Sequence, residues 1–301
     1  MGGAPTLFDR SLARRRLDRA LAAPASPGSD FLLARVAEDM ADRLTAVLRR
    51  FPLALDAGTP GPQAAAALVA SGQVDRVIRL APTTAAAGTG GFSAVVGDEE
   101  RLPLADGVLD LVVSLLSLQG VNDLPGALVQ LRRALRPDGL FLGCLLGGAS
   151  LTELRQSLAA AEAEVEGGVS PRVAPFADVR DMGALLQRAG FALPVTDSDT
   201  LTVRYADPLA LMRDLRATGA TNVLVERRRT PLRRETLMRA FAIYAERFAD
   251  PDGRVRATVE LVWLSGWSPH ESQQKPLRPG SAKARLADAL GVPERPTGEK
   301  P

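Results

Sequence analysis

The sequence predicts an α/β fold with an open, mostly parallel β-sheet that is covered by helices on both faces. Two observations carry this prediction. From residue 52 onward, short runs that are apolar on both faces alternate with helical stretches, as a parallel sheet between two helical layers requires. Later in the chain, residues 200–205 alternate polar and apolar side chains, which is typical of an antiparallel strand with one wet face. We therefore expect ligands to bind beyond the carboxyl ends of the parallel strands.

The composition narrows the class of protein. The chain has 301 residues, 46% hydrophobic and 24% charged, which excludes a largely disordered protein. A single cysteine, Cys144, excludes a disulfide framework, and a single histidine, His270, excludes a two-histidine metal site. The net charge of +2 does not indicate a nucleic-acid binder. No apolar run reaches the roughly 18 residues that cross a bilayer, so we expect a cytoplasmic protein without a membrane span.

The first 50 residues are expected to form an N-terminal helical lid. A basic helix comes first and is followed by a Pro/Ala/Ser linker at residues 22–27. In the next helix Val36, Met40 and Leu44 repeat at helical spacing, so they share one apolar face.

Residues 51–290 are expected to form the main domain, and residues 291–301 an unstructured tail rich in Pro, Gly, Lys and Glu. In its first half, residues 51–148, the expected strands are 53–55, 77–80, 94–96, 109–114 and 140–146, with helices at 63–70 and 124–135. In its second half, residues 149–290, the expected helices are 151–166, 179–189, 208–216 and 236–248, with strands at 200–205 and 258–264. We expect the two late strands to pair antiparallel at one sheet edge, with the helices between them as an insertion.

Three segments resemble motifs of the class I S-adenosylmethionine-dependent methyltransferases. They are Gly97-Asp98-Glu99-Glu100-Arg101-Leu102-Pro103, then Leu109-Asp110-Leu111-Val112-Val113-Ser114 followed by Asn122-Asp123, and Leu135-Arg136-Pro137-Asp138-Gly139-Leu140. The resemblance implies a Rossmann-like class I methyltransferase fold, with a mostly parallel seven-stranded sheet, an antiparallel edge hairpin, N-terminal helices and a helical insertion.

A closer resemblance covers nearly the whole chain. It is to the family of the methyltransferase-like assembly factor of respiratory complex I and its bacterial relatives; the malonyl-carrier-protein O-methyltransferase of biotin synthesis is a more distant relative. The resemblance implies S-adenosylmethionine as cofactor and a protein substrate or respiratory-complex subunit as partner. The segments that carry it are Phe8-Asp9-Arg10, Phe51-Pro52-Leu53-Ala54-Leu55-Asp56, Val121-Asn122-Asp123-Leu124-Pro125, Leu151-Thr152-Glu153-Leu154-Arg155, Glu166-Gly167-Gly168, Ser170-Pro171, Gly266-Trp267-Ser268-Pro269-His270-Glu271-Ser272-Gln273 and Gly280-Ser281-Ala282.

The chemistry of S-adenosylmethionine indicates where it would bind. A glycine turn after the first strand lets backbone approach the amino-acid end, and acids after the second and third strands accept from the ribose hydroxyls and the adenine amine. By resemblance, the expected cofactor contacts are Asp56, Gly58, Thr59, Leu80, Asp98, Glu99 and Ser114.

The same positions depart from the family pattern, so we predict a degenerate cofactor site. The pattern Asp-x-Gly-x-Gly-x-Gly is here Asp56-Ala57-Gly58-Thr59-Pro60-Gly61-Pro62, and proline has no N–H to offer a ligand. Leu80-Ala81 stand in place of the ribose-binding acid. Losing two charge-assisted hydrogen bonds, each worth roughly 1.5–3 kcal/mol, weakens binding on the order of 100-fold. The alternative hypothesis is therefore a non-catalytic assembly or interaction protein on a methyltransferase scaffold.

Two residues are candidates for catalysis, Gln119 and His270. Gln119 stands where the family has a histidine before Val-Asn-Asp, and an amide does not titrate near neutrality. His270 lies beside Glu271, which would orient it; the competing interpretation is a turn histidine bonded to backbone. The resemblance also raises arginine hydroxylation, for which one histidine cannot complete a two-histidine iron triad.

Overall fold

A computed structural model describes residues 6–24, 28–274 and 291. Residues 1–269 form one compact unit and residues 270–301 a second. The predicted tail at residues 291–301 lies, apart from Gly291, outside the described residues.

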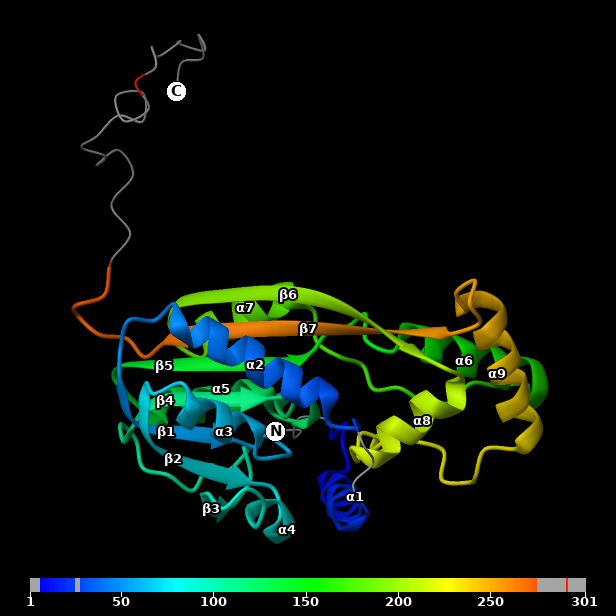
Figure 1. The fold of residues 1–301 in the computed structure, drawn as a ribbon, viewed down its shortest axis with the longest axis horizontal. Helices are drawn as coiled ribbons and strands as arrows, with labels where there is room; N and C mark the ends of the chain where they lie inside the picture. Colours follow the sequence, from blue (N-terminus) through cyan, green and yellow to red (C-terminus); the bar gives the residue numbers. More distant parts are fainter. Residues whose placement is uncertain (1–5, 25–27, 275–290, 292–301) are drawn as a thin grey trace, which may run out of the picture. The chain divides into compact units, whose positions relative to one another are not determined.

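A seven-stranded sheet forms the centre of the first unit (Figure 1), in the order β3-β2-β1-β4-β5-β7-β6. Strands β1 to β5 pair parallel, and β7 pairs antiparallel with both β5 and β6. The predicted parallel sheet and its antiparallel edge pair are therefore confirmed. The strands are β1 (Phe51–Ala57), β2 (Val74–Ala81), β3 (Ser93–Val96), β4 (Leu109–Leu115), β5 (Leu135–Leu146), β6 (Ala192–Tyr205) and β7 (Val255–Trp267).

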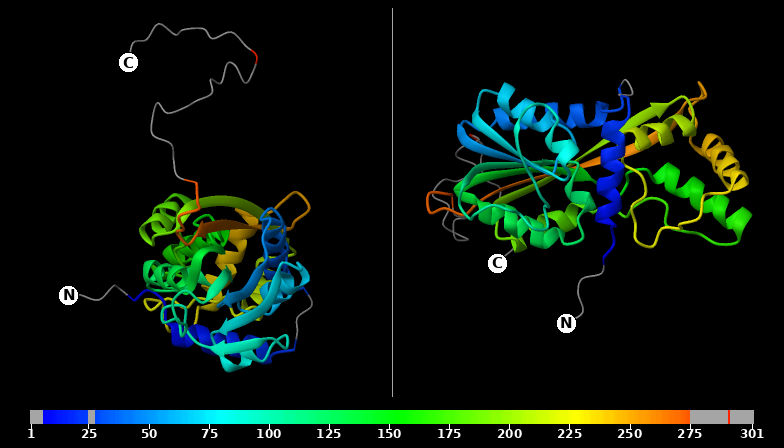
Figure 2. Two further views of the ribbon diagram at one scale, coloured as in Figure 1. Left: turned by 90° about the vertical axis from the view of Figure 1, so that its left-hand side faces the viewer. Right: turned by 90° about the horizontal axis from the view of Figure 1, so that it is seen from below.

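Helices cover the two faces of the sheet (Figures 1 and 2). On one face α2 (Phe31–Thr45) and α3 (Gln63–Ala70) pack their apolar side chains against β1 and β4, with Met40 and Leu68 among the buried residues. On the other face α5 (Leu124–Ala134) packs against β5, and α7 (Val179–Arg188) packs against β6 and β7. A short helix, α4 (Thr84–Ala87), follows β2. Both cores combine the apolar runs that predicted the sheet with the apolar faces of these helices.

The two late strands extend beyond the rest of the sheet. Strand β5 pairs with β7 only from Leu261 to Trp267, whereas the whole of β7 pairs with β6. The projecting ribbon packs with α6 (Thr152–Glu166), α8 (Pro208–Ala217) and α9 (Arg234–Phe248) in a third apolar core. Helices α8 and α9 lie between β6 and β7 in the chain, as the predicted insertion does.

The first helix, α1 (Arg10–Ala22), lies at the carboxyl ends of the parallel strands, beside the helical insertion (Figure 2). Phe8, just before it, forms a bridge with Leu224 of the insertion. Asn122, in the loop after β4, accepts from the backbone N–H groups of Leu7 and Phe8 at 2.8 and 2.7 Å. The segment just before α1 is thus held over the edge of the sheet where ligands are expected.

Strand β5 is longer than expected, because it begins at Leu135 and passes through the segment Pro137-Asp138-Gly139. We expected a turn at that segment. The backbone instead bulges there: the pairing with β4 shifts between Leu109 and Leu111, and Asp138 has a φ of +64°. Within the described residues, no helix is both long enough and apolar enough to cross a membrane.

Candidate functional site

The candidate site lies at the carboxyl ends of β1, β2, β3 and β4. The strand order reverses direction between β1 and β4, and open α/β sheets bind ligands at such a point. Gly58 follows β1, Asp98 and Glu99 follow β3, and the 3-10 turn η1 (Leu118–Gly120) follows β4. The structure therefore brings together the predicted residues from three separate loops.

Gly58 has the conformation that the turn after β1 requires. Its φ is +77°, a left-handed value that favours glycine, and its N–H donates to the carbonyl of Leu80 at 2.9 Å. A Cβ at Gly58 would collide with the carboxylate of Glu99 and with Ser117 Oγ. The side chains of Glu99 and Ser117 therefore fill the space beside Gly58 that a ligand would otherwise enter.

Asp56, beneath this turn, forms a buried ion pair with Arg79 of β2. The Arg79 Nε to Asp56 Oδ2 distance is 3.1 Å, and each residue is only 1% exposed. Burial raises the pKa of Asp56 to about 6, against the opposing effects of Thr59 and Arg79. The guanidinium of Arg79 also binds the two neighbouring turns, through Thr59 O (3.2 Å), Gly61 O (2.7 Å), Ala86 O (3.0 Å), Thr89 O (3.2 Å) and Thr89 Oγ1 (2.9 Å).

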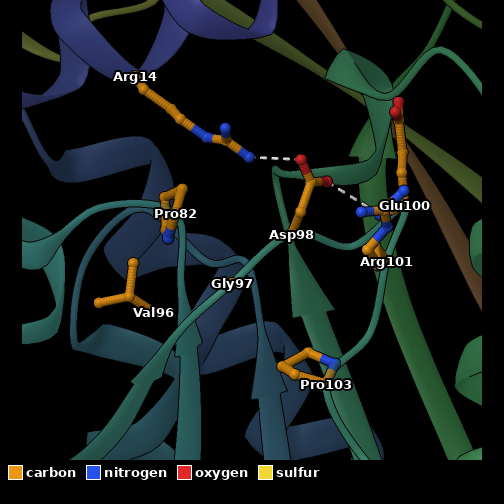
Figure 3. A pocket seen from close by; sticks show the side chains of 8 residues that line it. All are labelled: Arg14, Pro82, Val96, Gly97, Asp98, Glu100, Arg101 and Pro103. Atoms are coloured by element: carbon orange, nitrogen blue, oxygen red, sulfur yellow. Dashed lines mark hydrogen bonds and ion pairs between the residues drawn. The ribbon is translucent and has the colours of Figure 1, made fainter.

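Asp98 stands in the wall of a cavity of about 560 Å³ (Figure 3). Its Oδ1 accepts from the backbone N–H of Glu100 at 2.9 Å and from Arg10 at 2.7 Å, and its Oδ2 pairs with Arg14. Burial acts to raise the pKa of Asp98, but these donors together outweigh it and hold the pKa below its ordinary value. The cavity is lined by Arg14, Pro82, Val96, Gly97, Asp98, Glu100, Arg101 and Pro103.

Glu99 is almost fully buried, at 3% exposure, and binds a cation from α1. Its Oε2 pairs with Arg10, and its Oε1 accepts from Ser117 Oγ. The other arm of Arg10 donates from Nη1 to the carbonyl of Gly120 at 3.1 Å. Arg10 therefore links the loops after β3 and β4.

The other three residues predicted to contact the cofactor are buried and packed against, or hydrogen-bonded to, other parts of the protein. Leu80 is 2% exposed and packs on Gly97, where a Cβ would lie 2.6 Å from Leu80 Cδ1. Ser114 is buried, and its hydroxyl donates to the carbonyl of Ala57 at 2.8 Å. Thr59 is buried, and its Oγ1 accepts from the backbone N–H of Leu115 at 3.2 Å.

The two catalytic candidates belong to different units. Gln119 lies beside the site, in η1, where its Nε2 donates to the carbonyl of Leu116 at 2.7 Å and its buried Oε1 has no hydrogen-bond partner. His270 belongs to the second unit, where its Nδ1 lies 2.7 Å from Ser272 Oγ. Both therefore remain unassigned as catalytic groups.

A second cavity, of about 290 Å³, lies elsewhere, between the end of α2 and strands β5, β6 and β7. The Arg43 guanidinium lies over the Trp263 ring in its wall, 4.4 Å from the ring centroid. Among the described residues there is no group of three or more His, Cys, Asp or Glu side chains that could hold a metal ion. Cys144 is buried, and burial raises the pKa of its thiol.

Sequence reasoning missed Arg10, Arg14 and Arg79. Arg14 belongs to the basic helix that the sequence predicted at the start of the chain, for which no partner was expected, and it pairs with Asp98. Arg79 carried a usable signal, since an arginine within a strand that is apolar on both faces requires a buried acceptor. The register supplies that acceptor, because Arg79 lies opposite Asp56.

The site fits the two ends of an adenosyl cofactor differently. The cavity beside Asp98 offers a carboxylate and apolar walls from Pro82, Val96 and Pro103, which suit an adenine base. The space over Gly58, which suits the amino-acid end, is filled by Glu99. The cavity therefore suits the adenine base as the site stands, whereas the ribose lacks its carboxylate and the amino-acid end requires Glu99 to move.

Known proteins resemble the chain in sequence and in fold. A family model described as "Methyltransferase domain" matches residues 55–143. The chain is 41% identical over 287 residues to the "Arginine-hydroxylase NDUFAF5, mitochondrial" of Danio rerio, covering 94% of this chain and 89% of that protein. It is 35% identical over 277 residues to the malonyl-(acyl-carrier protein) O-methyltransferase of a Methylovorus species, covering 87% and 90% respectively.

Among solved structures, the BH2331 protein of Bacillus halodurans C-125 matches with a TM-score of 0.53 at 16% identity. The match covers 77% of this chain and 98% of that one. It confirms the predicted Rossmann-like methyltransferase fold.

Proposed function

Because the chain belongs to the methyltransferase-domain family that includes the NDUFAF5 arginine-hydroxylases, we propose that it binds S-adenosylmethionine and acts on or beside a protein of respiratory complex I. The family resemblance supports the complex I partner. We also propose a cytoplasmic location, which rests on the sequence alone. One observation carries the cofactor assignment: the cavity of about 560 Å³ at the ends of β2 and β3, with Asp98 in its wall.

The proposed site is weaker than that of a family member with an intact pattern. Leu80 and Ala81 provide no carboxylate for the ribose, and Glu99 has to leave the space over Gly58 before the amino-acid end can enter. Both features lower the affinity for the cofactor, and neither closes the cavity beside Asp98 that would hold the adenine base.

Titration calorimetry tests this proposal. S-adenosylmethionine is titrated into the full chain and into Asp98→Ala, with Asp106→Ala as a matched surface control because Asp106 is exposed and pairs only with Arg133 in the described structure. We expect binding that Asp98→Ala weakens and Asp106→Ala leaves unchanged. No heat at millimolar cofactor would refute the cofactor assignment.

The second candidate function is a non-catalytic assembly protein on the same scaffold. It is favoured by the side chains of Glu99 and Ser117 over Gly58. Co-purification with a respiratory-complex subunit, unchanged by Asp98→Ala, would support it. Loss of the partner with that substitution would count against it.

Mass spectrometry of the co-purified subunit separates the possible reactions. A gain of one methylene per site assigns methyl transfer, and a gain of one oxygen assigns the hydroxylation named for the relatives. An unmodified subunit that still binds the chain assigns the non-catalytic role.

A further inference from the structure

The second cavity, between the end of α2 and strands β5, β6 and β7, has both tryptophans of the chain in its wall. These are Trp263 and Trp267 of β7, and they stand beside Leu140 and Leu142 of β5 and Val47 after α2. The volume of about 290 Å³ gives room for roughly ten groups of the size of water, at about 30 Å³ each. The cavity therefore suits a small ligand with an apolar body and is too small for an adenosyl cofactor.

This cavity is separate from the one beside Asp98. The Asp98 cavity lies at the carboxyl ends of β2 and β3, towards one edge of the sheet, whereas the second cavity lies on β5, β7 and β6, towards the other edge. Among the described residues, no side chain lines both cavities. A ligand of the second cavity is therefore distinct from the cofactor.

The polar side chains in the wall of the second cavity are hydrogen-bond donors, apart from one carboxylate, Asp197. The donors are Arg43, Ser265, Trp263 and Trp267. Within the described part of the chain, neither indole N–H nor the Ser265 hydroxyl has an acceptor. Trp263 is only 3% exposed, and the N–H of a buried tryptophan usually has a partner. The wall is therefore prepared for a ligand that accepts hydrogen bonds.

Arg43 gives this wall a positive charge. Its Nη2 donates to Asp197 Oδ2 at 2.8 Å, while its Nε and Nη1 have no acceptor among the residues that the structure describes. The side chains of Arg43 and Asp197 are 37% and 55% exposed, and an ion pair as exposed as this contributes little to stability. The planar guanidinium can therefore receive a second carboxylate on its free donors.

We propose that the second cavity is a binding site for a small monocarboxylate with an apolar body. The carboxylate pairs with Arg43 and accepts from the indole N–H groups, and the body contacts Leu140, Leu142 and Val47. A concave, mostly apolar wall with a few polar groups is typical of small-molecule sites. Two indole rings and a guanidinium plane are flat, so the wall favours an aromatic body. This site does not rest on the proposed function.

Tryptophan fluorescence tests the proposal, because both tryptophans of the chain line this cavity. 3-Phenylpropionate is titrated into the full chain, with 3-phenylpropionamide as the matched neutral probe. We expect a saturable change in emission with the acid. The amide should bind at least about tenfold more weakly, because it loses the hydrogen bonds between ionised groups.

Variants of α2 and β6 assign the carboxylate contact. Arg43→Gln should weaken binding of the acid by about tenfold and change binding of the amide much less. Arg35→Gln is the matched control and should bind as the wild type does, because Arg35 lies on the same helix, pairs with Asp39 and does not line the cavity. Asp197→Asn frees Arg43 from its ion pair and should tighten binding of the acid by about twofold to fivefold.

Octanoate has the same charge and a similar size, and it decides the body of the ligand. Weaker binding of octanoate than of 3-phenylpropionate would support the aromatic body, and tighter binding would support the same carboxylate site with an aliphatic body. No change in emission with either acid at millimolar concentration would overturn the proposal. Equal affinities of the wild type for the acid and the amide would also overturn it, and this comparison does not depend on any variant folding.

Discussion

Arg79 shows how one buried charge can organise the turns around a ligand site. Its guanidinium pairs with Asp56 and also holds carbonyls of both the turn after β1 and the turn after β2. Pro60 and Pro62 remove N–H groups from the first of these turns. The backbone carbonyls of this turn accept from the Arg79 guanidinium, which holds the turn in shape without a ligand.

We predict that Asp56→Asn and Arg79→Met each lower the free energy of unfolding by about 3–5 kcal/mol, because each leaves one buried charge unpaired. The double variant should lose clearly less than the sum of the two. Urea denaturation measures all three values. Strict additivity would show that the pair is not coupled.

A second prediction at this scale concerns the missing ribose acid. Ala81 is the last residue of β2 and precedes Pro82, which lines the cavity. Ala81→Asp should tighten S-adenosylmethionine binding by roughly 100-fold, since it supplies two charge-assisted hydrogen bonds. Ala81→Asn is the matched control and should gain much less. Equal calorimetric affinities of the two variants would contradict the assignment of the ribose position.

At the scale of elements, α1 depends on carboxylates for its position. Asp98 receives Arg10 and Arg14, and Asp9 caps the helix by accepting from Leu12 N–H at 2.9 Å. The Leu12 N–H holds the pKa of Asp9 below its ordinary value of 3.8, and the pKa of Asp98 is lowered as well. A lowered pKa in the docked state means that ionisation and docking favour each other.

We therefore predict that α1 is fully docked above about pH 4 and is released as the pH falls through the lowered pKa values of Asp9 and Asp98. Amide NMR shifts of residues 10–22, followed from pH 6 to pH 3, measure the release. Asp98→Asn should weaken docking at pH 6 and reduce the pH dependence. Shifts that are independent of pH in the wild type would contradict the prediction.

At the scale of the whole molecule, the architecture could be predicted because it depends on patterns that hold over many residues. From a run that is apolar on both faces we expected a strand at residues 109–114, and β4 spans residues 109–115. The helix expected at residues 63–70 has those bounds in the structure. The alternation at residues 200–205 predicted only the end of β6, which begins at Ala192. In its first half the apolar side chains Leu193 and Val195 are exposed and a polar run follows at residues 196–200, so the pattern of a strand with one buried face is missing there.

The sequence was enough to predict where the candidate site lies, but not which side chains contact each other in it. Asp98, Glu99 and Gly58 were expected together because the carboxyl ends of parallel strands meet at one edge. Arg10 was not expected there, since nothing in its local sequence specifies a partner 88 residues away. Side-chain pairing across the fold is a tertiary property, and periodicity carries no information about it.

Hydrogen–deuterium exchange with and without S-adenosylhomocysteine tests the central claim most directly, because it locates the ligand as well as detecting it. The account predicts slower exchange in the segments that line the Asp98 cavity, residues 82–84 and 96–101, and no change around Trp263 in the second cavity. Protection confined to the Trp263 cavity, or none in residues 96–101 at saturating ligand, would contradict it.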